Sequence, residues 1–127
     1  MKTESDYYRI HFRLTCPHPA QLEQIVGRLR SNFTEASVLL ARAIEHRLYD
    51  QTWLVPGYDL LPLIAGLDLP TLVLQGEHDF VPVEIPTRIA AGMLNGRLTV
   101  LGGCGHFAYF QSPDLVRRHV AEFLRES

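Results

Sequence analysis

Apolar residues in the first part of the chain recur every three to four positions, as they do along one face of a helix. After Pro19, a residue well suited to a first helical turn, they are Leu22, Ile25, Val26 and Leu29. A second helix is predicted to begin at Thr34, which can cap it, and to carry an apolar face made of Leu40, Ala41, Ile44 and Leu48. Residues 8–15 fit either a strand or a helix, and we favour the helix. The first half is therefore predicted to be helical.

Proline and glycine interrupt the middle of the chain. Residues 53–69 contain four such breakers, which are Pro56, Gly57, Pro62 and Gly66. They predict an apolar connector with at most one short turn of helix. Beyond the connector the pattern changes to short apolar runs. Residues 71–74 predict a strand buried on both faces, and residues 98–101 predict a second strand followed by a flexible loop, GGCGH.

Two more helices are predicted, one between the strands and one after them. The first opens at Pro86 and is terminated by Gly96, and the last begins at Ser112-Pro113-Asp114. The inner face of this last helix consists of Val116, Val120, Phe123 and Leu124. The order strand, helix, strand, helix is typical of a parallel sheet with crossover helices, so the predicted fold class is α/β.

Composition places the chain among ordinary globular proteins and excludes several functions. Its 127 residues suit one domain, and a net charge of -2 leaves no basic field for nucleic acid or an anionic membrane. The longest apolar stretch, Leu60–Leu67, is far shorter than the ~20 residues that cross a bilayer. The N-terminus lacks the apolar core of a secretion signal, and Cys16 and Cys104 cannot form a disulfide framework, so we expect a cytoplasmic protein.

An acid and a base follow the two predicted strands. Asp79 comes shortly after the first strand, and His106 comes shortly after the second. Because a helical crossover joins the strands, they should be parallel, so both residues are expected at the same carboxyl edge of the sheet. An aspartate that accepts a hydrogen bond from one imidazole nitrogen leaves the other free to act as a base toward a nucleophile. The spacing thus predicts a catalytic pair that needs a third member.

Residues 69–124 resemble the C-terminal part of an α/β-hydrolase, with a strand ending in G-x-x-D, a helix, a strand ending in G-H and a closing helix. The resemblance implies a partial α/β-hydrolase fold. It also implies that Asp79 and His106 are the second and third members of a Ser-Asp-His triad, which uses no metal or organic cofactor.

The helical part resembles the cap of proline iminopeptidase-like enzymes. Three segments carry this resemblance, which are Tyr7-Tyr8-Arg9, Ala41-Arg42-Ala43-Ile44-Glu45-His46 and Tyr58-Asp59-Leu60-Leu61. The resemblance implies a helical cap or lid segment over residues 1–66 and the C-terminal part of the catalytic domain over residues 67–127.

The nucleophile elbow of the family, G-x-S-x-G, is absent from the sequence. No serine has glycines at the required spacing, whether Ser5, Ser31, Ser37, Ser112 or Ser127. We therefore expect the C-terminal portion of a serine hydrolase, acting on an amide or ester through an acyl-enzyme. Its serine half would lie upstream, as in a fragment, a separately expressed region or a truncated gene. Alone the chain should be inactive, and it should pair with that half or with itself. The alternative is a non-catalytic interaction or dimerisation module derived from such an enzyme.

Other side chains are candidates for contacts with a small-molecule or short-peptide substrate. Glu45 falls where the iminopeptidase cap carries an acidic residue for the free amino terminus of the substrate, although a glutamate on a helix flank is more often simply solvated. Four aromatic residues could line an apolar pocket or belong to the core, which are Trp53, Phe80, Phe107 and Tyr109. Gln111 stands where related sequences commonly have Glu, which argues against a supporting role for this side chain.

Two other kinds of site are disfavoured by their spacing. Glu77 and His78 could suggest a metal site together with His106, but no i, i+4 His pair and no CxxC accompanies them. Cys104 lies on the same short loop as His106 and is poorly placed to meet its imidazole head on, so we interpret it as a small packing residue.

Overall fold

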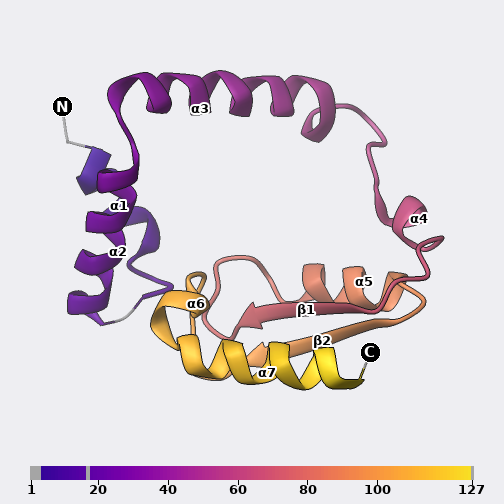
Figure 1. The fold of residues 1–127 in the computed structure, drawn as a ribbon. Helices are drawn as coiled ribbons and strands as arrows, with labels where there is room; N and C mark the ends of the chain where they lie inside the picture. The colour runs from indigo at the N-terminus through magenta and orange to yellow at the C-terminus, as the bar shows by residue number, and fades with distance from the viewer. Residues whose placement is uncertain (1–3, 17, 127) are drawn as a thin grey trace.

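Helices make up the first part of the chain in the computed structural model, which describes residues 4–16 and 18–126 (Figure 1). Residues 1–3, 17 and 127, which belong to the segments predicted over 1–66 and 67–127, lie outside these ranges. The first helices are α1 (Glu4–Phe12), α2 (Pro19–Asn32) and α3 (Glu35–Leu48). The helical interpretation of residues 8–15 is confirmed as far as Phe12, and the two helices that follow are confirmed as well.

Capping and burial explain where these helices lie. Pro19 occupies the first turn of α2, where a backbone N–H would have no intrahelical partner. The Oγ1 of Thr34 accepts the N–H of Ser37 at 3.2 Å and so caps α3, as predicted. α2 packs against α1, and Ile25 and Val26 of its predicted apolar face are buried.

The apolar face predicted for α3 is present but exposed. No residue of α3 is buried, and Leu40, Ile44 and Leu48 are 62%, 49% and 42% exposed. The helix continues into one π-helical turn, η1 (Tyr49–Trp53), which the sequence pattern does not predict. The connector then forms α4 (Leu61–Ile64), the short turn of helix expected there. In Figure 1, α3 runs along the side of the molecule opposite the strands.

The two strands, β1 (Thr71–Gly76) and β2 (Gly96–Leu101), form the predicted parallel pair. Their register runs from Thr71 opposite Gly96 to Gly76 opposite Leu101, so both strands are longer than predicted. The prediction that β1 is buried on both faces is wrong. Its residues up to Leu74 are half-buried, because among residues 4–16 and 18–126 only β2 pairs with it. Its buried residues lie at its C-terminal end, toward the site.

The crossover helix, α5 (Glu84–Gly92), packs on both strands. It begins before the predicted start at Pro86, which is tolerated in the first turn because an N–H there would lack a partner. It also ends before Gly96, which opens β2 instead of terminating the helix. A glycine is needed at this position because a Cβ would lie 2.1 Å from the carbonyl oxygen of Ala90.

The chain closes with α6 (Ala108–Gln111), which the pattern does not predict, and α7 (Pro113–Glu126), which begins at the predicted Pro113. The prediction that the apolar face of α7 is buried is wrong, because Val120 and Leu124 are 37% and 68% exposed. In Figure 1, α5 and α7 lie on opposite sides of the strand pair. Two strands of 6 residues offer too little surface to cover a helix of 14 residues.

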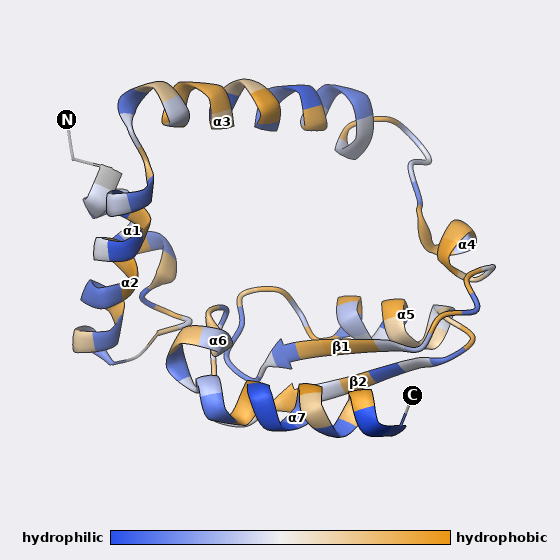
Figure 2. Cartoon of the chain, viewed as in Figure 1, coloured by the Kyte–Doolittle hydropathy of each residue, from blue (hydrophilic) through white to orange (hydrophobic). Residues whose placement is uncertain are grey.

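The hydrophobic core joins the helical part of the chain to the part that contains the strands. Its buried members are Cys16, Ile25 and Phe107, and Phe12, Leu22 and Leu29 pack against them. Figure 2 shows an apolar middle in β1 and an apolar α4, whereas apolar and polar residues alternate along α3 and α7. Within the described ranges, no helix combines the length and the apolar character needed to cross a membrane.

Candidate active site

Asp79 and His106 meet at the carboxyl edge of the strand pair. The Nδ1 of His106 lies 2.9 Å from Oδ1 and 3.1 Å from Oδ2 of Asp79. Because an ionised carboxylate can only accept, Nδ1 carries the proton of this hydrogen bond. The Asp79 side chain is 8% exposed and that of His106 is 36% exposed. The acid is therefore shielded from water, while the imidazole remains accessible.

A backbone turn and a buried glutamine hold Asp79 in place. Its Oδ1 accepts the N–H of Val81 at 3.0 Å, which closes a tight turn around the carboxylate. Gln75, buried near the end of β1, donates from Nε2 to the carbonyl of Val81 at 2.9 Å. Both backbone groups of Val81 are thus paired, and the orientation of Asp79 depends on Gln75. Sequence reasoning missed Gln75, although an amide residue next to the end of an apolar strand is a usable signal.

Close backbone contact holds the loop of Asp79 against the loop of His106. The N–H of His78 donates to the carbonyl of Cys104 at 2.8 Å. A Cβ on Gly76 would lie 2.2 Å from the carbonyl oxygen of Gly105, so only glycine permits this approach. The GGCGH segment was expected to be a flexible loop, but it is a turn held in place by these backbone contacts. Cys104 within it is fully buried, as expected for a packing residue.

Three phenylalanine rings surround the imidazole of His106. Phe80 lies closest, with ring centroids 4.3 Å apart, and Phe107 meets the imidazole edge to face at 5.2 Å. Phe12, from the end of α1, lies parallel to it with an interplanar angle of 7° and a centroid distance of 6.3 Å. Two of the predicted aromatic residues are thus at the site. Phe12 was missed, because nothing in the local pattern connects α1 with the His106 loop.

A groove of about 200 Å³ lies between α1 and α3, and Phe12 is part of its lining. Its polar lining includes His11, Arg42 and Glu45. Glu45 is therefore in the groove, but its Oε2 accepts a hydrogen bond from Arg42 at 2.9 Å, so its carboxylate is already paired. The groove holds one charge of each sign within hydrogen-bond distance of the other.

The remaining aromatic candidates lie away from the imidazole. Trp53 packs edge to face on Tyr49 at the C-terminal end of α3, with ring centroids 4.8 Å apart. Tyr109 contacts Phe107 and Phe110, and is largely exposed. The structure thus brings neither Trp53 nor Tyr109 into ring contact with His106.

Gln111, for which the sequence argues against a supporting role, makes two hydrogen bonds next to His106. Its Oε1 accepts the N–H of Gly105 at 2.7 Å, and its Nε2 donates to the carbonyl of Thr15 at 3.3 Å. That expectation is wrong in structural terms, because the side chain connects the loop of His106 with the segment that follows α1.

The arrangement provides a base with an oriented tautomer. Asp79 fixes the proton on Nδ1, so Nε2 presents a lone pair, and nothing in residues 4–16 and 18–126 hydrogen bonds to it. No described serine contacts the imidazole, and no group of three or more metal-ligating side chains occurs in the same ranges. The site can therefore move a proton, and no serine is among the described contacts of the imidazole.

Comparison with known proteins finds hydrolases that are similar to about half of this chain. No family model matches the chain. It is 36% identical to a 2-hydroxy-6-oxononadienedioate/2-hydroxy-6-oxononatrienedioate hydrolase of Paraburkholderia xenovorans over 67 residues. This match covers 52% of this chain and 23% of the relative. It is also 37% identical over 63 residues to the uncharacterized hydrolase YugF of Bacillus subtilis, a match that covers 49% of this chain and 23% of that protein. The chain thus spans less than a quarter of the length of these curated relatives.

A solved structure supports the same relationship. A predicted CIB-like hydrolase from Thermoplasma acidophilum superposes with a TM-score of 0.51 and 28% identity, over 54% of this chain and 33% of that one. Together with the parallel strands and their crossover helix, this similarity shows a partial α/β-hydrolase fold. The matching part corresponds to the C-terminal part of such a fold.

Proposed function

We propose that this chain supplies the acid and the base of a serine-type hydrolase. The observation that carries the proposal is the hydrogen bond from His106 to the buried Asp79, which leaves Nε2 unpartnered among the described residues. In the proposed reaction, Nε2 takes the hydroxyl proton of a serine as its oxygen bonds to the substrate carbonyl carbon. His106 then gives that proton to the leaving group as its bond breaks. Water repeats the sequence and releases the acyl group from the serine.

The serine and the oxyanion-hole donors would come from another segment or chain, because the 127 residues contain no G-x-S-x-G. The outer edge of β1 suits such a partner, since no strand among the described residues pairs with it. Unpaired strand edges bind further strands through backbone hydrogen bonds. We propose that a complementary hydrolase segment pairs there, and that the chain alone does not react with a serine-directed fluorophosphonate.

The substrate class depends on the Arg42–Glu45 pair in the α1–α3 groove. The iminopeptidase-like resemblance favours a peptide substrate whose ammonium group pairs with Glu45. The names of the dioate hydrolases favour a substrate whose carboxylate pairs with Arg42. Either substrate would compete with the 2.9 Å ion pair between the two side chains for one of its partners. We propose an amide or ester substrate, with the sign of its charge decided by comparing Glu45→Gln with Arg42→Gln in a reconstituted enzyme.

A chimera tests the acid and base roles. The matched 67-residue segment of the Paraburkholderia xenovorans hydrolase is replaced by the corresponding segment of this chain, and hydrolysis of the substrate of that relative is measured. We expect activity that His106→Ala and Asp79→Asn each reduce by about 10⁴-fold. His78→Ala is the matched control, because this half-exposed histidine is outside the pair. A folded chimera that is inactive, or one that keeps its activity without His106, contradicts the proposal.

A second candidate function is the interaction module, which the exposed apolar row on α3 favours. Leu40, Ile44 and Leu48 are spaced four residues apart and lie on one face of that helix. Light scattering of the purified chain distinguishes the two candidates. Stable self-association that Ile44→Lys abolishes, combined with an inactive chimera, supports the module; a monomer with an active chimera supports the hydrolase.

A further inference from the structure

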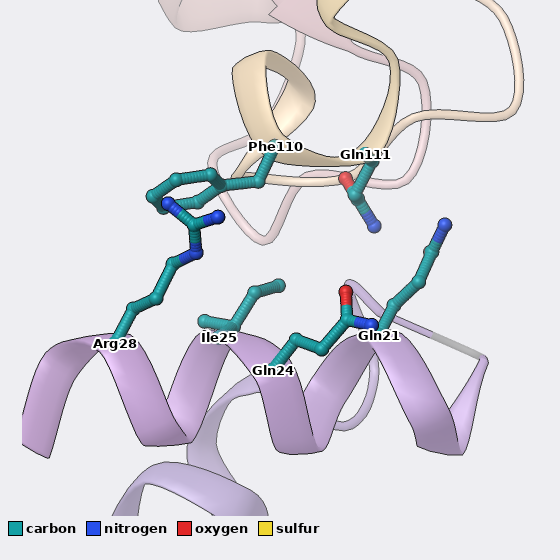
Figure 3. A pocket seen from close by; sticks show the side chains of 6 residues that line it. All are labelled: Gln21, Gln24, Ile25, Arg28, Phe110 and Gln111. Carbon is teal, nitrogen blue, oxygen red and sulfur yellow. The ribbon is translucent and has the colours of Figure 1, made fainter.

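We infer that Gln111 is a positioning residue for His106, acting as a two-ended clamp between the backbone of Gly105 and that of Thr15. Its catalytic meaning rests on the proposed function of His106. The two hydrogen bonds have N···O distances of 2.7 Å to Gly105 and 3.3 Å to Thr15, and the second joins residues 96 positions apart. Figure 3 shows Gln111 extending from α6 toward α2.

The two backbone groups need this partner because they lie in a tightly packed place. Thr15 and Gly105 are both buried. A Cβ on Gly105 would lie 1.6 Å from the carbonyl oxygen of Thr15, so the two segments touch without room for bridging water. A buried N–H or C=O that loses its partner costs free energy, since no solvent replaces the bond.

An amide side chain serves both ends. Gly105 offers a donor and Thr15 offers an acceptor, so the clamp must accept at one atom and donate at the other. A glutamate could accept from Gly105 but would place a second acceptor against the carbonyl of Thr15. A methionine could do neither, although it has nearly the same length.

The clamp acts on both sides of the imidazole. Gly105 directly precedes His106, so its N–H fixes the backbone from which the imidazole projects. Thr15 follows the end of α1, where its N–H and hydroxyl donate to the carbonyl of Phe12. Phe12 in turn lies parallel to the imidazole. One amide therefore sets the position of His106 and that of a ring that faces it.

A glutamine of the same pocket provides a matched control. Gln24 lines the small cavity of about 70 Å³ between α2 and α6 that Gln111 also lines (Figure 3). Its side chain makes no hydrogen bond with any residue that the structure describes. A change from Gln to Glu at residue 24 therefore adds the same charge in the same pocket without breaking the clamp.

Nuclear magnetic resonance of the full chain tests the inference. In the parent chain we expect a scalar coupling across the hydrogen bond from the Gly105 nitrogen to the side-chain carbonyl of Gln111. In Gln111→Met, the Gly105 amide should exchange at least about tenfold faster and the ring signals of His106 should move. In Gln111→Glu, Gly105 should stay protected while the amides of Thr15 and Cys16 exchange faster. Gln24→Glu should change none of these signals.

Two outcomes overturn the inference. One is a parent chain in which the coupling is absent and Gly105 exchanges like an exposed amide, a result that requires no variant to fold. The other is a folded Gln111→Met chain with unchanged Gly105 exchange and His106 signals. An active chimera together with either outcome refutes the clamp and supports the proposed function. An inactive chimera together with the expected spectra supports the clamp and refutes the proposed function.

Discussion

The carboxylate of Glu77 accepts the N–H of Gly103 at 2.8 Å, so the loop that carries Asp79 holds the loop that carries His106 by a side chain as well as by backbone bonds. Gly103 has φ +68°, a left-handed conformation that glycine adopts at little cost and that turns its N–H toward Glu77. The acid and the base therefore share one supporting structure.

Removal of this contact should loosen the His106 loop. We expect Glu77→Ala to lower the free energy of unfolding by about 1 kcal/mol, because the bond has a charged acceptor but a half-exposed side chain. Glu77→Gln keeps an acceptor oxygen and should lose less. Denaturant unfolding and the exchange rate of the Gly103 amide measure both effects. Equal losses in the two variants would show that the charge matters and the hydrogen bond does not.

Glycine at positions 76 and 105 is required by the close approach of the segments. A Cβ at Gly105 would lie 1.6 Å from the oxygen of Thr15, and one at Gly76 would lie 2.2 Å from the oxygen of Gly105. We expect Gly105→Ala and Gly76→Ala each to destabilise the chain by about 3 kcal/mol or more. Gly27→Ala is the control, since nothing lies within 4 Å of its Cβ and alanine favours a helix. Thermal unfolding should therefore show two large losses and one small gain.

Gln75 should affect Asp79 without touching it. Gln75→Met leaves the carbonyl of Val81 without its donor, and we expect a loss of about 1 to 2 kcal/mol in the free energy of unfolding. The Val81 amide, which lies in the turn that holds Asp79, should also exchange its hydrogen with solvent faster. Gln75→Glu is a second variant, because it has a similar size but no donor. A stable chain with a protected Val81 amide in both variants would contradict the role of Gln75.

The sequence predicts the acid and the base because both obey a local rule, that ligating side chains follow the carboxyl ends of parallel strands. The positions of Asp79 and His106 can be predicted once the order of the strands is known. Phe12 and Gln111 are different, because their contacts join segments far apart in the chain and leave no periodic signal near either end. The signal for Gln75, a polar residue near the end of an apolar strand, is local but has several explanations before the turn is seen.

The burial of helices is the other part that the pattern does not determine. Periodicity identifies the apolar side of α3 and of α7, but it does not say which element covers that side. Leu40 and Leu124 belong to such faces and are exposed, because two strands and their crossover helix provide too little covering surface. Ile25 has the same kind of pattern and is buried, because it belongs to a core cluster that includes Phe107 from the other half of the chain.

The tautomer of His106 should depend on Asp79. With the carboxylate accepting from Nδ1, the neutral imidazole should carry its proton on Nδ1, and long-range ¹H–¹⁵N spectra should show Nε2 as the unprotonated nitrogen. In Asp79→Asn we expect the tautomers to mix, because the amide can also donate. His119, whose Nδ1 lies 3.6 Å from Glu122 on α7, is the internal control and should not change. Identical His106 spectra in the parent and in Asp79→Asn would contradict the assigned tautomer.

Acid should weaken the pairing of α1 with α2. Glu23 accepts two hydrogen bonds from Arg9, at 2.7 and 2.9 Å, and these bonds lower the pKa of Glu23 from its ordinary value of 4.5. Because the folded pKa lies below the unfolded one, the pairing contributes its full stability above the ordinary pKa and loses it as the pH falls through the folded value. The protection of the α1 amides, measured as their exchange rate relative to that of an unstructured chain at the same pH, should therefore fall below about pH 4.5, and salt should weaken the effect, since the side chains are exposed. Glu23→Gln should remove this acid step, and a variant that keeps it would assign the step to another carboxylate.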